Sequence, residues 1–513
     1  MRDKNRREFL ADVGRGMLVA SLGSVVAADL EVAPAWAGEG GEPLTFGTME
    51  PLVELMQETP VTKLLPKLVE KMKAGTDLRT LTAAGALANA RTFGGHDYTG
   101  YHALMALAPA YQMAAELPEE QRPLPVLKVL YRNTNRIQEE GGRTHEALHP
   151  IKPAELPRER DGGELLREAT RRRDQQGAEE TFAALARGPI GEAFNHLQFA
   201  VEDEVDVHRV VLAWRSWVLR DITGQEHAQT LLRQSVRYCV DAEKSMYEHK
   251  RTPAIRTVLP RLLDQYRLVG RKPGERKAED KWIERLAQTI YGDGRERAAE
   301  AAAAALAEGM APDAVAEAIS LAANRLVLCD PGRTRAEPGK PIGSVHGASV
   351  GVHASDSANA WRNIARVSNA RNTFASLICG AFHTAGQNGG QNKEPYPPAE
   401  QVAKIETKEP DRLLRLAEAA IKEKNQAGAA ALIHVYGQQK YPPRPVFDLL
   451  LRYAVSEDGA LHAEKYYRTV TEEFAATRPA FRWRHLVALA RVSASEYGQT
   501  APGYAEARRL LKL

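Results

Sequence analysis

An all-α fold is predicted by three features of the sequence. Apolar residues recur at helical spacing from about residue 49 to the C-terminal end, strand-like alternation is nearly absent, and the composition favours helix formers. Aromatic residues make up only 6% of the 513 residues, whereas Ala, Leu, Arg and Glu abound. We therefore expect a multi-helical array of about twenty helices with little or no sheet.

The individual helices are predicted from stretches with an apolar stripe. The first clear one, 64–75, places Leu64, Leu65, Leu68 and Met72 on one face and ends at Gly75. The same pattern recurs in four later stretches: 122–138, 313–328, 409–424 and 444–459. The Ala-rich stretch 295–309 predicts a solvated helix, because Ala has the highest helix propensity. Pro, Gly and Asn predict long loops at 141–163, 330–343 and 385–400.

Two stretches of the chain resemble each other. Residues 75–91 and 309–325 align without a gap and are identical at five positions, and each is followed by a loop and a pair of histidines. We therefore expect a helical domain over 38–400 that contains two related halves, at about 60–140 and 295–385. A functional site is expected at their junction, because ligand sites often lie between such units. Residues 401–513 are expected to form a C-terminal region of helical hairpins.

The N-terminal segment has the three parts of an export signal in the correct order. Arg6 and Arg7 are followed by the residues EFL, 16–28 is a charge-free run, and 35–37 reads A-W-A. The segment resembles a twin-arginine (Tat) signal peptide, which implies export of the folded chain by the Tat translocase and cleavage after Ala37. We expect a soluble periplasmic protein, since no apolar run reaches the roughly 18 residues needed to span a bilayer. Tat export also favours a bound metal or redox group, because cofactors are often inserted before transport.

Composition and missing motifs exclude several classes of function. The net charge is only +3, from 69 basic and 66 acidic residues, so there is no electrostatic case for binding nucleic acid. The three cysteines are far apart and are interpreted as buried hydrophobic residues. The chain has no P-loop, no GxGxxG after a strand, no HExxH, no GxSxG and no CxxCH, so no nucleotide cofactor is expected.

The two pairs of histidines are the main candidates for a site: His96 with His102, and His346 with His353. Residues seven apart on one helix are about 10 Å apart, which is too far for both to bind one ion at about 2.1 Å. We therefore expect each pair to contribute one side of a shared site.

Carboxylates at helical spacing are further candidate ligands. Asp356 is three residues after His353, and His208 is four residues after Glu204, so each pair shares a helix face. Such a shell suits iron, copper or zinc. His196 or His383 could complete it, whereas His434, His462 and His485 are interpreted as structural. Alternatively, the histidines together with Tyr98 and Tyr101 form a pocket that binds an organic ligand and transfers protons.

The stretches HDYTGYHALMAL and VHGASVGVHASDSANAW resemble the helices of questin oxidase-like proteins, which are helical oxygenases that act on aromatic polyketides in the founding cases. The resemblance implies a role for His346 and His353. It does not extend to an NADPH-using reaction, since the periplasm has no pool of that reductant.

The functional hypothesis is an exported, metal-dependent oxidoreductase that acts on a small-molecule ligand. One alternative is a non-catalytic helical-repeat protein that binds a partner in the cell envelope. Another is a metal-free hydrolase or lyase that uses His–Asp acid–base chemistry.

Overall fold

The computed structural model describes residues 43–337, 340–345 and 349–513. These residues form 23 α-helices, four short 3₁₀ turns and no strand, which confirms the all-α prediction. The 3₁₀ turns are η1 (Gly47–Met49), η2 (Glu119–Gln121), η3 (Gly142–His145) and η4 (Gln225–His227).

Residues Leu44–Leu513 form one unit. The predicted signal peptide and His346 lie outside the described residues. Within the described part of the chain, no helix is both long and apolar enough to cross a membrane.

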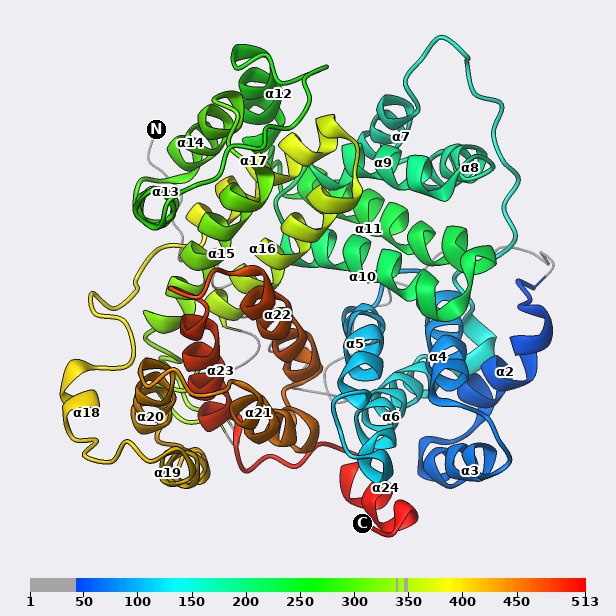
Figure 1. Ribbon diagram of the computed structural model, residues 1–513. Coiled ribbons are helices and arrows are strands. Elements are labelled where there is room, and N and C mark those ends of the chain that lie inside the picture. Colours follow the sequence, from blue (N-terminus) through cyan, green and yellow to red (C-terminus); the bar gives the residue numbers. More distant parts are fainter. Residues whose placement is uncertain (1–42, 338–339, 346–348) are drawn as a thin grey trace. The chain divides into compact units, whose positions relative to one another are not determined.

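Five helices near the N-terminal end form the first five-helix group: α2 (Glu50–Glu58), α3 (Val61–Lys73), α4 (Leu78–Phe93), α5 (Tyr98–Ala114) and α6 (Pro123–Glu139). Five later helices form the second five-helix group: α13 (Asp280–Gly292), α14 (Arg295–Ala307), α15 (Pro312–Leu328), α16 (Val350–Val367) and α17 (Ala370–Gly386). In Figure 1 the first group runs from blue to cyan and the second from green to yellow.

The two groups have matching helix boundaries. The ends of α2 and α13 at Glu58 and Gly292 are 234 residues apart in sequence. The same offset separates the starts of α3 and α14 (61 and 295), their ends (73 and 307), and the starts of α4 and α15 (78 and 312). The gapless alignment of 75–91 with 309–325 has this offset too.

The two groups also pack in the same way. Helix α4 packs on α2, α5 and α6, and α15 packs on α13, α16 and α17. Likewise, α3 packs on α6 and α14 packs on α17. The groups therefore share helix order and packing partners, and they occupy the ranges in which the sequence predicts two related halves.

The remaining helices follow each group. After the first group come α7 (Gly162–Arg171), α8 (Gln175–Leu185), α9 (Ile190–Val201), α10 (Val207–Thr223), α11 (Ala228–Glu248) and α12 (Ile255–Gln265). After the second come α18 (Ala399–Ala403), α19 (Pro410–Lys422), α20 (Gln426–Gln438), α21 (Arg444–Ser456), α22 (His462–Ala476), α23 (Trp483–Glu496) and α24 (Tyr504–Leu511). Two of them, α10 and α22, each pack on both α5 and α16, so the C-terminal helices are joined to the earlier ones.

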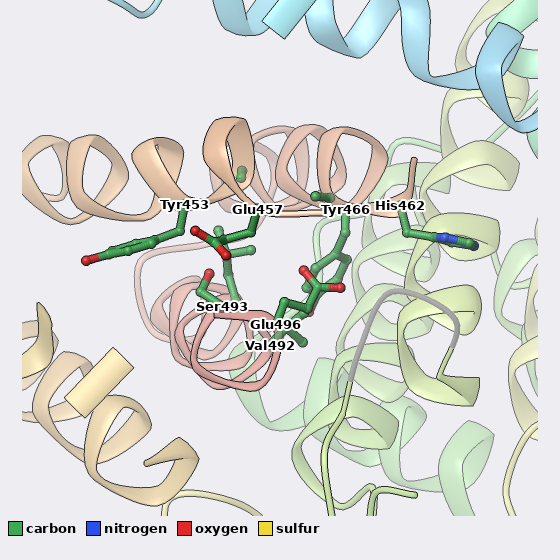
Figure 2. A pocket seen from close by; sticks show the side chains of 10 residues that line it. Tyr453, Glu457, His462, Tyr466, Val492, Ser493 and Glu496 are labelled. Atoms are coloured by element: carbon green, nitrogen blue, oxygen red, sulfur yellow. The ribbon is translucent and has the colours of Figure 1, made fainter. Parts of the chain in front are cut away.

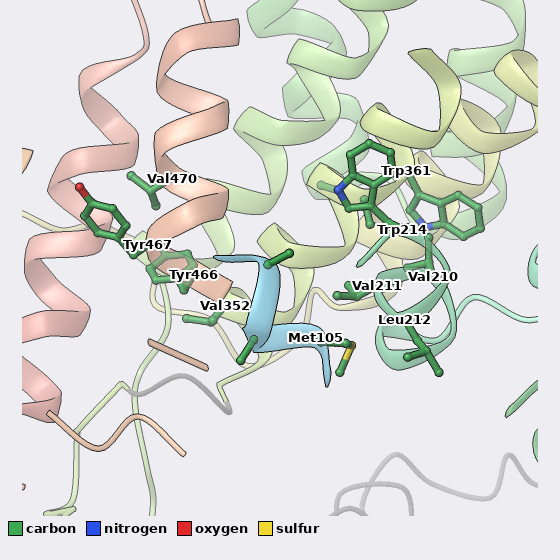
Figure 3. Packing of buried hydrophobic residues seen from close by; sticks show 14 of the residues in the cluster. Met105, Val210, Val211, Leu212, Trp214, Val352, Trp361, Tyr466, Tyr467 and Val470 are labelled. Carbon is green, nitrogen blue, oxygen red and sulfur yellow. The ribbon is translucent and has the colours of Figure 1, made fainter. Parts of the chain in front are cut away.

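The four helices α5, α10, α16 and α22 share one apolar interior. Figure 3 shows side chains from all four in it, among them Met105, Trp214, Trp361 and Tyr466. The helix α16 comes very close to α15, because a Cβ at Gly351 would lie 2.6 Å from the backbone of Val327. Only glycine fits at this position, two residues before His353.

Candidate functional site: a four-histidine cluster

Four helices each contribute one histidine to a common cluster. These four helices pack in a closed ring, in which α5 packs on α10, α10 on α16, α16 on α22, and α22 on α5. His102 is the fifth residue of α5, His208 the second of α10, His353 the fourth of α16 and His462 the first of α22. The N-terminal turns of four helices therefore meet at one place.

Local sequence sets where three of these helices begin. Asp97 caps α5 by accepting a hydrogen bond of 2.6 Å from the backbone N–H of Gly100. Asp206 caps α10 through the N–H of Arg209, at 2.9 Å. Ser349 caps α16 in the same way. Asp and Ser are strong N-cap residues, so each cap fixes the first turn that holds a histidine.

Each of the four imidazole rings lies next to two others of the cluster. The distances between ring centres are 4.8 Å for His102–His208, 5.6 Å for His208–His353, 5.2 Å for His353–His462 and 4.9 Å for His462–His102. An imidazole bound through Nε2 at about 2.1 Å has its ring centre about 3.2 Å from the ion, so neighbouring rings of a tetrahedral shell are about 5.2 Å apart. The observed spacings lie on both sides of that value. The two Nε2 atoms of His353 and His462 are 3.2 Å apart.

The outer nitrogens of three imidazoles face acceptors. His102 Nδ1 donates to the carbonyl of Tyr98 at 2.7 Å, and His462 Nδ1 donates to the carbonyl of Ala460 at 3.0 Å. His208 Nδ1 is 3.9 Å from a carboxylate oxygen of Asp206. A donating Nδ1–H leaves the lone pair on Nε2, which is the arrangement found in metal-ligating histidines.

Two of the inner nitrogens are buried without a partner. Nε2 of His102 and Nε2 of His208 have no hydrogen-bond partner among the described residues. Buried polar atoms nearly always have one, so these two nitrogens are available to a ligand. Burial lowers the pKa of His102 well below its usual range and that of His208 to about 4. Both are therefore neutral at pH 7, as a metal ligand must be.

Three tyrosines line one side of the cluster. The ring of Tyr98 is 4.3 Å from that of His102, and the ring of Tyr101 is 5.3 Å from that of His208. Tyr238 packs edge-on against Tyr101 and donates to Asp206 at 2.9 Å. Burial raises the pKa of all three phenols, so they stay protonated. Tyr98 is 43% exposed, so the cluster reaches the surface on this side.

A charged layer lies one turn farther along α16 and α22. Asp356 accepts a hydrogen bond of 2.7 Å from Thr469, and burial raises the pKa of its carboxyl group. Lys465 is three residues after His462, and burial lowers its pKa to about 8.

A small cavity of about 10 Å³ lies on the other side of His462 and is lined by Tyr466 and Ser493, among others. Figure 2 shows that the imidazole of His462 points away from Tyr453 and Glu457, which also line this cavity.

The structure brings together five of the residues that the sequence proposed: His102, His353, His208, Tyr98 and Tyr101. Asp356 lies about one helical turn after His353 on α16 and accepts a hydrogen bond from Thr469.

Two other proposed residues lie elsewhere, which corrects the expectation for them. His96 precedes α5, and its side chain turns toward α11, where Arg237 is 2.5 Å from its Nε2 and Asp241 pairs with the other side of the ring. Glu204 precedes α10 and is engaged by Arg209 and Arg251.

His462 is also a member of the cluster, which corrects the expectation that it is structural. The sequence holds little signal for it, because His462 follows His208 by 254 residues, whereas the two five-helix groups are offset by 234. The sequence also proposes His196 or His383 to complete the metal-ligand shell, but both have different neighbours. His383 accepts a hydrogen bond from Trp361, and His196 lines a separate pocket beside Phe199.

In the described part of the chain, no group of three or more His, Cys, Asp or Glu side chains stands in a ready-made metal-binding geometry. No family model, curated protein or solved structure matches this chain.

Proposed function

We propose that the protein is an exported, metal-dependent oxidoreductase whose metal site is the four-histidine cluster. The observation that carries the proposal is that two buried Nε2 atoms lack partners while the Nδ1 atoms of the same rings face acceptors. An ion bound by the Nε2 atoms of His102, His208, His353 and His462 would satisfy these lone pairs.

The donor set limits the choice of metal. Four neutral imidazoles suit copper, iron and zinc, and of these copper and iron could supply one-electron chemistry. The residues around them have separate roles. Tyr98 and Tyr101 would contact a small-molecule substrate on the exposed side, and the nearby Lys465 and Asp356 would balance charge and move protons.

The N-terminal segment supports an exported location. Arg6, Arg7 and the A-W-A at 35–37 favour Tat-dependent transport into the periplasm, a route that accepts folded chains with metal already bound. Changing Arg6 and Arg7 to Lys should stop export, and fractionation of cells would measure this.

Metal analysis of untagged protein from the export compartment tests the proposal. About one copper, iron or zinc ion per chain is expected. His208→Ala and His462→Ala should each lower the metal content strongly, because each removes a ligand. His434→Ala is the matched control, since His434 lies beside Gln438 and outside the cluster. A wild-type protein without metal, or equal metal in all variants, would contradict the proposal.

A non-catalytic binding protein is the second candidate. Helices α19 and α20 pack on each other, and α20 packs on α23, as in helical-repeat scaffolds. A metal-free protein with no change in ligand binding on His208→Ala would favour it.

A further inference from the structure

A large groove lies along α15, and no residue of the four-histidine cluster lines it. The groove, of about 1000 Å³, opens between α13, α15, α18, α20 and α23. Its lining includes the apolar side chains of Leu321, Leu328, Val402 and Val487, and the segment Pro395–Pro397. This volume is at the upper end of the range for small-molecule sites.

Positive charge is in excess around the groove. Lys281, Arg285, Arg325, Arg484 and Glu284 line it. The only carboxylate of the set, Glu284, pairs with Arg484 at 2.6 Å. The other three cations therefore have no carboxylate of the groove as a partner, and they favour an anionic ligand.

Two buried polar atoms in the lining lack partners among the described residues. Asn324 is only 2% exposed, and its Oδ1 accepts no hydrogen bond. Nε of Arg325 is also buried and unpaired. The guanidinium of Arg325 contacts Gln288 and stands over the ring of Tyr291 at 4.5 Å. A bound molecule that offers both an acceptor and a donor would satisfy these atoms.

The first five-helix group contains an arginine at the matching position with its partners in place. Arg91 is 234 residues before Arg325 and is fully buried. It is 2.5 Å from Glu50 and 3.1 Å from Glu146, and it stands over the ring of Phe46 at 5.3 Å. Arg91 therefore binds carboxylates and an aromatic ring together.

The matching carboxylate of the second group is turned away from its arginine. Glu284 is 234 residues after Glu50 but pairs with Arg484 instead of Arg325. Arg325 thus lacks the carboxylate that its counterpart has, and an open groove takes the place of the buried cluster around Arg91.

We propose that the groove binds a small aromatic carboxylate. Its carboxylate pairs with Arg325, with Arg285 nearby, and its ring packs between Leu321, Leu328 and Tyr396. A hydroxyl group on the ligand donates to Oδ1 of Asn324. The proposal does not rest on the metal site, since none of the four histidines of the cluster lines the groove.

Calorimetric titration of the full chain with 6-hydroxy-2-naphthoate, which carries both the carboxylate and the hydroxyl group, tests this. Saturable binding is expected, and the neutral analogue 6-(hydroxymethyl)-2-naphthol, which keeps the ring hydroxyl, should bind about tenfold more weakly because it forms no charge-assisted pair. Arg325→Gln should weaken 6-hydroxy-2-naphthoate binding by about the same factor.

Two further variants keep the test decisive if Arg325→Gln fails to fold. Arg285→Gln changes an exposed side chain and should weaken binding by about threefold. Arg297→Gln, on the exposed surface of α14 beside Asp293, should leave the affinity unchanged. Absence of saturable binding, equal affinity for the two probes, or an unchanged affinity in both Arg325→Gln and Arg285→Gln would overturn the proposal.

Discussion

His102 and His208 each combine an Nδ1 that faces an acceptor with an unpaired, buried Nε2. The hydrogen bond from His102 Nδ1 to the carbonyl of Tyr98 orients that ring, and a buried lone pair without a partner costs free energy unless something binds there. Two such rings are a costly arrangement without a ligand. This cost is the physical reason for assigning the cluster a role in binding rather than in packing.

Other histidines are buried with partners and give a prediction about pH. Burial lowers the pKa of His485 to about 4, and Thr477 is 3.2 Å from its Nε2. The unfolded chain takes up the proton near pH 6.5, whereas the folded chain does so only near pH 4. The free energy of unfolding should therefore fall as the pH falls from 6.5 to 4, by on the order of 2 kcal/mol at pH 5 from this residue.

Urea unfolding at a series of pH values measures this effect. His485→Gln should unfold with a weaker dependence on pH between 6.5 and 4 than the wild type, since the substituted side chain takes up no proton. Parallel curves for the two proteins would show that His485 does not titrate in this way.

Sequence reasoning found most of the cluster and misplaced the rest for a definable reason. The spacing of His102 and His353 after matched helices identified them, because helical periodicity and N-caps are local features. Which helix ends meet is decided by packing between distant segments. The position of His96, one residue before its helix cap, therefore could not reveal that it faces α11, nor could His462 be linked to α5.

At the scale of elements, a buried ion pair joins α16 to α22. Arg362 and Glu473 are 1% and 2% exposed in their side chains, and Asn359 donates to Glu473 at 2.9 Å. The pair keeps the two helices in register nearly three turns beyond His353 and His462. Helix boundaries were predictable from sequence, whereas this register depends on a contact between residues more than a hundred positions apart.

Breaking that pair should destabilise the fold strongly. Glu473→Leu should lower the free energy of unfolding by about 3–5 kcal/mol, because it leaves the buried Arg362 charge without a partner. Adding Arg362→Met should recover most of the loss. Asp448→Leu breaks an exposed pair with Arg444 and should cost less than about 1 kcal/mol. Urea unfolding of the wild type and the three variants measures this, and a small effect of Glu473→Leu alone would contradict it.

At the scale of the whole molecule, the two five-helix groups contribute α5 and α16, and the segments after them contribute α10 and α22. His102 and His353 lie near the starts of α5 and α16, the fourth helices of the two groups, and His208 and His462 lie at the starts of helices that follow each group. The cluster therefore lies where two similarly built parts of the chain meet. Neither part alone holds more than two of the four histidines.

This arrangement predicts cooperative unfolding. Helix α22 lies after residue 400 and packs on α5 and α16, which lie before it. Unfolding of the region after residue 400 would therefore expose apolar side chains of the region before it. Thermal unfolding of the protein, followed by circular dichroism and by tryptophan fluorescence, should give one coincident transition. Two separate transitions would show that the regions before and after residue 400 fold independently.

X-ray absorption of the protein loaded with one equivalent of Cu²⁺ tests the four-histidine metal site most directly. The spectrum should show three to four nitrogen ligands at about 2.0 Å with the multiple scattering of imidazole, and His208→Ala should remove one of them. A shell dominated by oxygen or sulfur, or a shell that His208→Ala leaves unchanged, would contradict the assignment.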